Sequence, residues 1–202
     1  MNKSVDDFKS FMSFNTFQVG EKSLYFNSVN FERSFSSYIG LLVNNYKKLN
    51  SLSPVSENFN KTSWKSLLKC GYNSIFYTLY HIFDGERINS VSFNDYFTLI
   101  NKFGMGKFQI IKNDSSSVVV RVFHSLEDEE YIKDFDSCEY PVAPYTAGII
   151  LGLYNFYEFF ANDAVQSLSI FETVNNTFNG RHYIEQKRSS IPDNSFSEFH
   201  IF

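Results

Sequence analysis

The sequence predicts an α+β fold in which a mostly antiparallel four-stranded sheet, made of two hairpins that flank a helix, packs with N-terminal helices. Three observations lead to this class. The first half of the chain carries apolar residues at helical spacing. The second half contains short strand-like runs separated by polar turns. The chain has 202 residues, of which 43% are hydrophobic, and this is enough to bury the core of one domain.

The N-terminal segment has a phenylalanine at every third position. These residues are Phe8, Phe11, Phe14 and Phe17. Their spacing is compatible with a short helix or with an arm that lies over a partner. Residues 24–27 are a candidate short strand, and the apolar residues of 30–48 recur at helical spacing, which predicts an amphipathic helix. Serine, proline and asparagine in 50–60 indicate a loop.

Residues 61–83 form the longest predicted helix, because a broad apolar stripe runs through them and ends at Asp84 and Gly85. We expect this helix to be largely buried. A second, short helix is predicted to start after Ser92, which has the features of an N-cap because Asp95 follows three residues later. This helix is expected to stop at Gly104.

The chain then changes its hydrophobic period. Residues 108–112 and 118–123 are strand-like and are joined by a polar turn at 113–117, so they predict an antiparallel hairpin. The acidic run 127–130 is expected to be a solvated helix start. Small residues alternate with large apolar ones in 143–160, which is the composition of a buried helix packed closely on a sheet.

A second hairpin is predicted from strands at 165–173 and 181–187 that turn at 175–180. The final segment, from Ser189, has the composition of a partly disordered tail, but it ends in apolar residues able to dock.

Aromatic residues are unusually frequent, since 24 Phe and 13 Tyr make up most of the 19% aromatic fraction. Two explanations stay open at this point: part of the excess lines a cavity, or the excess reflects a bias toward AT-rich codons, which also encode the abundant Asn.

The charge balance excludes some classes of function. The chain has 18 Lys and Arg against 22 Asp and Glu, a net charge of −4, so it lacks the basic footprint of a protein that binds nucleic acid directly. The apolar stretch 147–153 is too short to span a bilayer, which takes about 20 residues. The first residues, MNKSVDDFKSF, lack the apolar core of a signal peptide. We therefore expect a cytoplasmic protein with reduced cysteines.

No catalytic constellation is evident in the sequence. The glycines at Gly104 and Gly106 lack the remaining spacing of a phosphate loop and precede a strand, so a strand-entry turn is the favoured interpretation. His124 stands beside Ser125 and close to Glu127, but neighbours on a strand alternate between faces, which argues against a catalytic relay. We expect no enzymatic activity from these residues.

Four motifs occur in a characteristic order: Gly106–Phe108, Ser125–Glu127, Pro141–Gly148 and Glu172–Asn175. This succession resembles the 4-vinyl-reductase-type domain, the predicted hydrocarbon-binding family, which is related to the TRAPP vesicle-tethering subunits and to the ligand-binding fold of NO signalling. The resemblance covers about 20–188. It implies a ligand-binding domain over that range, with an N-terminal arm or short helix at 1–19 and a C-terminal tail at 189–202.

Zinc-binding members of the family use a helix cysteine, a strand glutamate and two cysteines of the last hairpin. The corresponding positions here are Ala143, Glu172, Asn175 and Ile184. A single carboxylate cannot supply a tetrahedral zinc site, so we expect no metal and no other cofactor. Without partners, Glu172 is costly to bury and is expected to be hydrogen-bonded or exposed.

The resemblance also implies a function, namely non-catalytic binding or sensing of a small hydrophobic or aromatic molecule in a pocket between the sheet and the helices. Aromatic residues near the predicted helix–sheet junction are the candidate lining residues, although each is also explained as ordinary core. They are Phe76, Tyr80, Phe108, Phe123, Tyr145 and Phe171.

Two further expectations concern partners. The stripe of 30–48, together with the N-terminal phenylalanines, predicts a homodimer interface, and a sensor of this kind needs a regulatory protein partner. Cys70 lies in the long predicted helix, where the tethering subunits carry an acylated cysteine; burial would instead keep the thiol inert. The alternatives are a structural dimerisation scaffold without ligand, and an accessory protein to a tetrapyrrole-type reductase.

Overall fold

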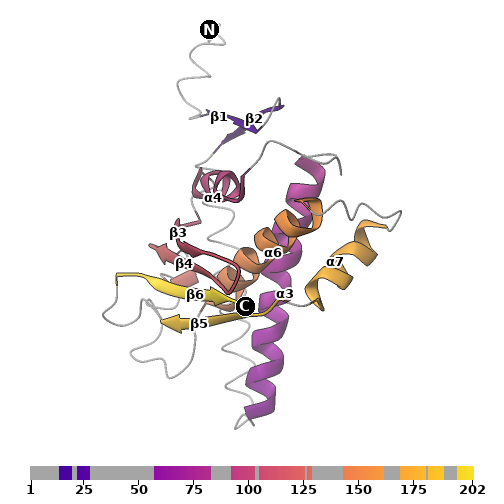
Figure 1. Cartoon of the computed structure of the whole chain (residues 1–202), viewed down its shortest axis with the longest axis vertical. Helices are drawn as coiled ribbons and strands as arrows, with labels where there is room; N and C mark the ends of the chain where they lie inside the picture. The colour runs from indigo at the N-terminus through magenta and orange to yellow at the C-terminus, as the bar shows by residue number, and fades with distance from the viewer. Residues whose placement is uncertain are drawn as a thin grey trace, which may run out of the picture.

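The computed structural model describes ten stretches of the chain, and all structural statements below refer to them (Figure 1). They are residues 14–19, 22–27, 57–82, 92–102, 105–125, 127–128, 143–161, 169–180, 182–188 and 195–202. The predicted helix at 30–48 and the residues Phe8 and Phe11 lie outside them.

A four-stranded antiparallel sheet forms one layer of the molecule. Its strands are β3 (Lys107–Asn113), β4 (Val118–Phe123), β5 (Ile184–Arg188) and β6 (Ser197–Ile201), in the order β3-β4-β6-β5. Every neighbouring pair is antiparallel, and β4 pairs with β6 so that Val120 faces Phe199. The predicted α+β class with an antiparallel four-stranded sheet is therefore confirmed.

The second hairpin differs from the prediction. A strand was expected at 165–173, but helix α7 (Ile170–Phe178) occupies the described part of that range. The hairpin is formed instead by β5 and β6. The apolar end of the C-terminal tail docks, as expected, because Ser197–Ile201 is a strand inside the sheet with Phe199 and Ile201 buried; the disorder suggested by the tail's composition is wrong for these residues. The sheet therefore extends past the predicted domain end at residue 188.

Two helices predicted in the first half, at 61–83 and after Ser92, are present in the described part of the chain. Helix α3 (Glu57–Ile82) covers nearly all of the predicted 61–83 and starts earlier, so the loop expected at 50–60 is wrong for its last four residues, 57–60. Helix α4 (Phe93–Lys102) follows Ser92, whose backbone N–H donates to the Asp95 carboxylate at 2.8 Å. The carboxylate thus satisfies one amide at the start of the helix, as the sequence predicted.

The N-terminal elements are strands. β1 (Phe14–Val19) and β2 (Lys22–Asn27) form a two-stranded antiparallel sheet. The strand predicted at 24–27 is confirmed, whereas the helical interpretation of the phenylalanine series is wrong for Phe14 and Phe17. The backbone at Phe14 and Phe17 is therefore extended and not helical.

Helix α6 (Pro144–Ala161) is the buried helix predicted from its small residues, and it lies between the sheet and α3 (Figure 1). Its glycines, however, face α3. A Cβ built at Gly148 would overlap the backbone carbonyl of Leu68, and one built at Gly71 of α3 would overlap the carbonyl of Tyr145. The two helices approach until their backbones touch, which no residue larger than glycine permits at these points.

One face of the sheet contributes to the core. Phe108, Val120, Val122, Ile184, Phe199 and Ile201 are buried and alternate with more exposed residues along their strands. No described helix combines the length and the hydropathy that a membrane crossing requires.

Candidate ligand-binding site

An aromatic cluster joins α4 to α6 and to β3. Phe93, Tyr96 and Phe97 lie on one buried face of α4, because positions three and four residues apart stack along a helix. The Tyr96 ring meets the Phe156 ring edge-on with centroids 5.9 Å apart, and the Phe97 and Phe108 rings are 6.2 Å apart. These spacings fall within the range of favourable aromatic pairs.

Helix α4 is held over β3 by one side chain. The Asn101 amide nitrogen donates to the Phe108 carbonyl at 3.0 Å, and its oxygen accepts the Phe108 backbone N–H at 2.6 Å. Asn101 therefore pairs with the edge strand as another strand would. This contact fixes the aromatic face of α4 against the sheet.

The cluster continues into α3. The Phe156 and Phe76 rings are 5.1 Å apart in an edge-to-face arrangement, and Phe76 stacks with Tyr72 at 5.7 Å. Phe76, Phe156 and Tyr72 are almost fully excluded from solvent. The rings thus form a continuous apolar region from the sheet edge to the centre of the helical layer.

Tyr96 places a phenolic hydroxyl among these rings. Burial raises the pKa of Tyr96 to about 12, and the neighbouring Tyr157 and Asp95 add to the effect. The hydroxyl is therefore protonated throughout the physiological range. A tyrosine hydroxyl among aromatic side chains is one of the polar groups that sites for small aromatic molecules use.

A polar network adjoins the cluster where α3, α6 and α7 meet. The Tyr72 hydroxyl donates to Thr177 Oγ1 at 2.7 Å, and Asn155 Nδ2 donates to the Thr177 carbonyl at 3.0 Å. Asn155 Oδ1 lies 3.0 Å from His182 Nδ1. Burial raises the pKa of Tyr72 to about 12, against the opposing effect of its hydrogen bonds. The network fixes α7 to the two longer helices.

A second polar group, which the sequence analysis missed, lies at the start of α6. Glu127 and Asp128 are helical, as expected, but they are only 3% and 2% exposed, so the solvation expected for 127–130 is wrong for both. Glu127 accepts the backbone N–H of Tyr145 at 3.1 Å and that of Thr146 at 2.7 Å. Glu127 is buried because it caps the first turn of α6.

His124, Ser125 and Glu127 are arranged as the sequence suggested. His124 is exposed with a φ of 52°, whereas Ser125 is buried and its hydroxyl lies 3.3 Å from the Thr146 hydroxyl. The chain turns sharply at His124, so the imidazole stays outside while Ser125 and Glu127 point inward.

The six predicted lining residues fall into different surroundings. Phe76 and Phe108 belong to the aromatic cluster, and Tyr80, one turn after Phe76 on α3, is half-buried against the same core. The Tyr145 hydroxyl donates to Ser74 at 3.0 Å at the crossing of α3 and α6. Phe123 is half-buried beside Phe196, and Phe171 is 66% exposed on α7.

The four positions of the relatives' zinc ligands have other roles here. Glu172 is exposed and lies on a helix instead of a strand, where it forms a capping box with Ser169, as expected for a hydrogen-bonded or exposed carboxylate. Asn175 donates to the Phe171 carbonyl, the Ala143 N–H donates to Gln186 at 3.2 Å, and Ile184 is buried. The described residues contain no group of three or more potential metal ligands.

Cys70 is a half-buried free thiol on α3 that packs against the core. Its acylation stays an untested alternative.

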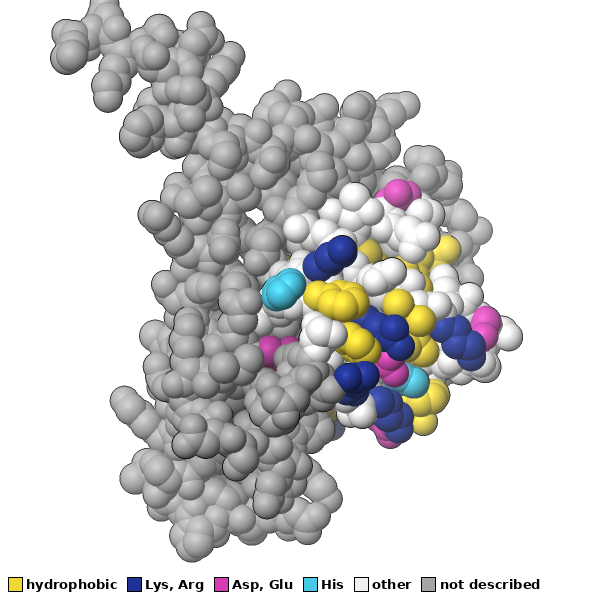
Figure 2. Space-filling model, turned by 90° about the vertical axis from the view of Figure 1, so that its left-hand side faces the viewer, with side chains coloured by type: hydrophobic (Ala, Val, Ile, Leu, Met, Phe, Trp, Pro, Cys, Tyr) yellow, Lys and Arg dark blue, Asp and Glu magenta, His cyan; other side chains and the backbone are white. Residues whose placement is uncertain are grey.

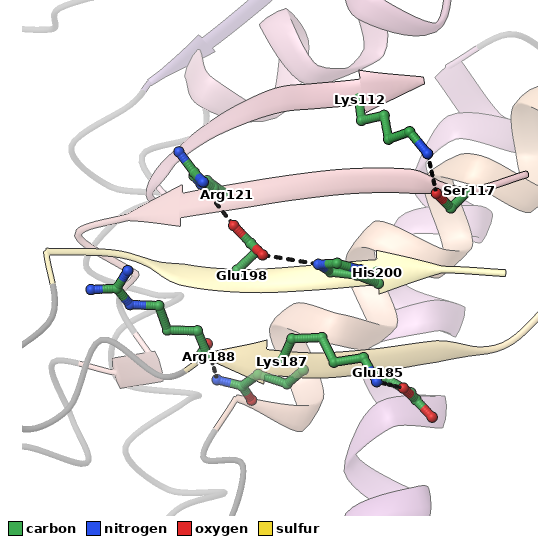
Figure 3. Close-up of polar contacts among 9 residues, drawn as sticks. Lys112, Ser117, Arg121, Glu185, Lys187, Arg188, Glu198 and His200 are labelled. Atoms are coloured by element: carbon green, nitrogen blue, oxygen red, sulfur yellow. Dashed lines mark hydrogen bonds and ion pairs between the residues drawn. The ribbon is translucent and has the colours of Figure 1, made fainter. Parts of the chain in front are cut away.

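The other face of the sheet carries charged and aromatic side chains together (Figure 2). Arg121 of β4 pairs with Glu198 of β6 at 2.8 Å, and Glu198 contacts His200 at 2.9 Å (Figure 3). The guanidinium groups of Arg121 and Arg188 lie 4.5 and 4.3 Å from the centre of the Phe196 ring. Most of these charges are therefore balanced within the face.

Comparison with known proteins places the fold but not the family. No protein-family model matches the sequence, and no curated protein sequence matches it. Among solved structures, the chain is similar to the phenol-responsive sensory domain of the transcription activator PoxR, solved with phenol, with a TM-score of 0.51 and 9% identity over 100% of this chain and 90% of that one. This likeness concerns the fold alone.

A trafficking protein particle complex subunit 3 from Naegleria fowleri, covalently bound to palmitic acid, is similar at a TM-score of 0.47. Its identity is 14%, over 86% of this chain and 94% of that one. The described elements define an α+β domain, and its fold is similar to that of the PoxR domain. Membership of the 4-vinyl-reductase-type family stays a prediction.

Proposed function

We propose that this protein is a non-catalytic binding or sensing domain for a small hydrophobic or aromatic molecule. The observation that carries the proposal is the aromatic cluster of α4, α6 and β3, which has the Tyr96 hydroxyl as a polar group among its rings. Aromatic side chains with a hydrogen-bonding group among them suit a ligand that is itself mostly apolar. The fold similarity to a phenol-responsive sensory domain supports the same choice.

The proposed site uses Phe76 and Phe108 from the sequence prediction together with Phe93, Tyr96, Phe97 and Phe156. Tyr80 and Tyr145 are retained as candidates at its margin, whereas Phe123 and Phe171 lie in other surroundings. We propose no catalytic residue and no cofactor. The protein is proposed to act in the cytoplasm, and its response to the ligand would pass to a protein partner.

Native mass spectrometry of the purified protein, followed by denaturing extraction, is the first test. A retained small apolar or aromatic molecule supports the proposal and identifies the chemical class. If nothing is retained, binding of phenol and of toluene is measured by calorimetry. Absence of binding by both probes, combined with an empty protein, would contradict the proposal and favour the structural scaffold. Co-purification of a redox cofactor would instead favour the reductase-accessory alternative.

Tyr96→Phe tests the polar group directly, because it removes only one hydroxyl. We expect the variant to bind phenol roughly tenfold more weakly, the equivalent of one hydrogen bond, and to bind toluene as before. Tyr183→Phe is the matched control, since Tyr183 is exposed near the sheet edge. Equal loss of both ligands would mean that Tyr96 shapes the site without donating to the ligand.

We also propose that the functional form is a homodimer, formed through 30–48 and the N-terminal phenylalanines. Light scattering coupled to size exclusion tests this directly. A monomer at micromolar concentration would contradict it.

A further inference from the structure

The hydrogen bonds around Asn155 of α6 have only one possible direction. The Thr177 carbonyl can only accept, and Asn155 Nδ2 lies 3.0 Å from it, so the amide nitrogen must face that carbonyl. The Thr177 hydroxyl donates to the Thr173 carbonyl at 2.8 Å. The Tyr72 hydroxyl must therefore donate to Thr177 Oγ1 and accept from Asn155 Nδ2. The Asn155 amide is thus held in one orientation, with its oxygen directed away from Thr177.

This orientation determines which nitrogen of His182 carries the proton. Asn155 Oδ1 can only accept, and it lies 3.0 Å from His182 Nδ1, so Nδ1 must donate. A neutral imidazole has one N–H and one acceptor nitrogen, so Nε2 is left as the acceptor. In the part of the chain that the structure describes, no group bonds to Nε2, and His182 is only half-buried. His182 therefore presents an unused hydrogen-bond acceptor.

The ring of Tyr154 lies beside the His182 ring. The two rings meet edge-on, with their centroids 4.8 Å apart. Tyr154 is also half-buried, and its hydroxyl has no hydrogen bond to any described residue. Burial raises the pKa of Tyr154, and Glu158 and Tyr157 raise it further, so the hydroxyl stays protonated and is a donor. An acceptor and a donor that the fold does not use thus lie on neighbouring rings.

These two side chains border the aromatic cluster. The Phe93 ring of α4 meets the Tyr154 ring edge-on at 5.6 Å and lies 5.3 Å from the Tyr157 ring. Tyr154 and Tyr157 are one turn apart on α6, and both are half-buried. Aromatic side chains that are partly open to solvent therefore lead from the cluster to His182.

The hydroxyl group of a phenol matches this pair, because it can donate one hydrogen bond and accept another. We propose that His182 and Tyr154 form a subsite for the hydroxyl group of a phenol-like molecule, in which His182 Nε2 accepts from that hydroxyl and the Tyr154 hydroxyl donates to its oxygen. The subsite uses residues other than Tyr96, and it rests on the proposed function in that the ligand is a small aromatic molecule. It adds the requirement that this molecule carries a hydrogen-bond donor.

Nitrogen NMR of the full chain, with ¹⁵N in the histidine rings, tests the tautomer and the subsite together. At about pH 8.5, where free imidazole side chains are neutral, we expect His182 to have a protonated Nδ1 and an unprotonated Nε2. Phenol should shift the Nε2 signal. Anisole, which keeps the ring and the oxygen but has no proton to donate, should not. Tyr96→Phe should keep the response to phenol, because it removes no group of the subsite.

Calorimetry with the same two molecules measures the contribution of each polar group. His182→Phe should bind phenol roughly tenfold more weakly and bind anisole as before, since only phenol donates to His182. Tyr154→Phe should weaken the binding of both molecules, because the oxygen of either can accept from Tyr154. His200→Phe is the matched control, since it makes the same change as His182→Phe on the other face of the sheet.

The proposal is overturned if Nε2 carries the proton. It is also overturned, while the proposed function stands, if phenol binds and the Nε2 signal stays unchanged. If phenol, anisole and toluene all fail to bind, the proposed function fails together with the subsite. Equal weakening of phenol and anisole in His182→Phe would mean that His182 only shapes its surroundings, and this too overturns the proposal. Should His182→Phe fail to fold, the NMR of the natural protein still decides.

Discussion

The hydroxyl group of Tyr72 donates a 2.7 Å hydrogen bond to Thr177 Oγ1, although the two residues are 105 positions apart in the chain. Asn155 Nδ2 donates to both partners, to the Tyr72 hydroxyl at 3.3 Å and to the Thr177 carbonyl at 3.0 Å. This relationship attaches the short helix α7 to α3 and α6 in the interior, where water cannot replace a missing partner.

Tyr72→Phe should therefore lower the free energy of unfolding by about 1–2 kcal/mol, because Thr177 and Asn155 lose a buried partner while the ring packing is kept. Urea denaturation measures the change. Tyr183→Phe is the control, since the same atom is removed from an exposed side chain. Identical stabilities for the two variants would mean that the bond to Thr177 makes no net contribution.

The contact between α3 and α6 predicts strong intolerance at Gly148. Gly148→Ala should destabilise the protein by at least about 2 kcal/mol, because the new methyl group overlaps the Leu68 carbonyl and the helices must separate. Gly180→Ala is the control: its Cβ would lie 3.0 Å from the Thr177 carbonyl, beyond the end of α7, and the cost should stay below about 1 kcal/mol. Thermal denaturation of both variants measures the two losses of stability. A Gly148→Ala protein as stable as the control would contradict the prediction and show that α3 and α6 separate at little cost.

The capping box of α7 predicts a pH-dependent effect of Ser169. The Ser169 hydroxyl and backbone N–H lower the pKa of Glu172, so the stabilisation from this carboxylate is present above the ordinary glutamate range and is lost as the pH falls through the lowered pKa. Ser169→Ala should cost about 1 kcal/mol near pH 7 and return the Glu172 pKa toward its ordinary range. NMR titration of the Glu172 carboxyl group measures this. An unchanged titration would contradict the capping assignment.

Truncation of a phenylalanine should cost much more stability inside the aromatic cluster than on the surface of the protein. Phe156→Ala should lower the free energy of unfolding by about 3–5 kcal/mol, because Phe156 is buried against Phe76 and Tyr96. Phe171→Ala should change it by less than about 0.5 kcal/mol, because 66% of Phe171 is exposed to solvent. Similar losses in chemical denaturation would mean that Phe171 is covered in solution, for example by a second copy of the chain.

The elements that could be predicted from the sequence are those with a long, uniform period. Helices α3 and α6 have this property, and the β3 and β4 strands are separated by a clear polar turn. Helix α7 was missed because 165–173 was interpreted as the first strand of a hairpin that turns at 175–180, although Ser169 and Glu172 have the spacing of a capping box. Strand β6 has no local signal beyond its alternation, since its position depends on β4 and β5.

The candidate site was predictable only where its residues lie on elements that the sequence predicts. Phe76 and Phe108 could be chosen because their elements were recognised, and the rings of α4 carried the same signal in their helical spacing. Burial of Glu127 and Asp128 was not predictable, because consecutive carboxylates normally indicate a solvated surface. Their environment is created by the first turn of α6, which comes later in the chain. Tyr145, whose backbone N–H Glu127 accepts, lies 18 residues after Glu127.

The position of β6 between β4 and β5 also affects the order of events during synthesis. When the ribosome has released β3, β4 and α6, the inner edge of β4 has no partner, because β6 is encoded 75 or more residues after it and follows β5. An unpaired apolar strand such as Val118–Phe123 is prone to pair with other chains. During this interval of synthesis the inner edge of β4 is therefore open to pairing with other chains.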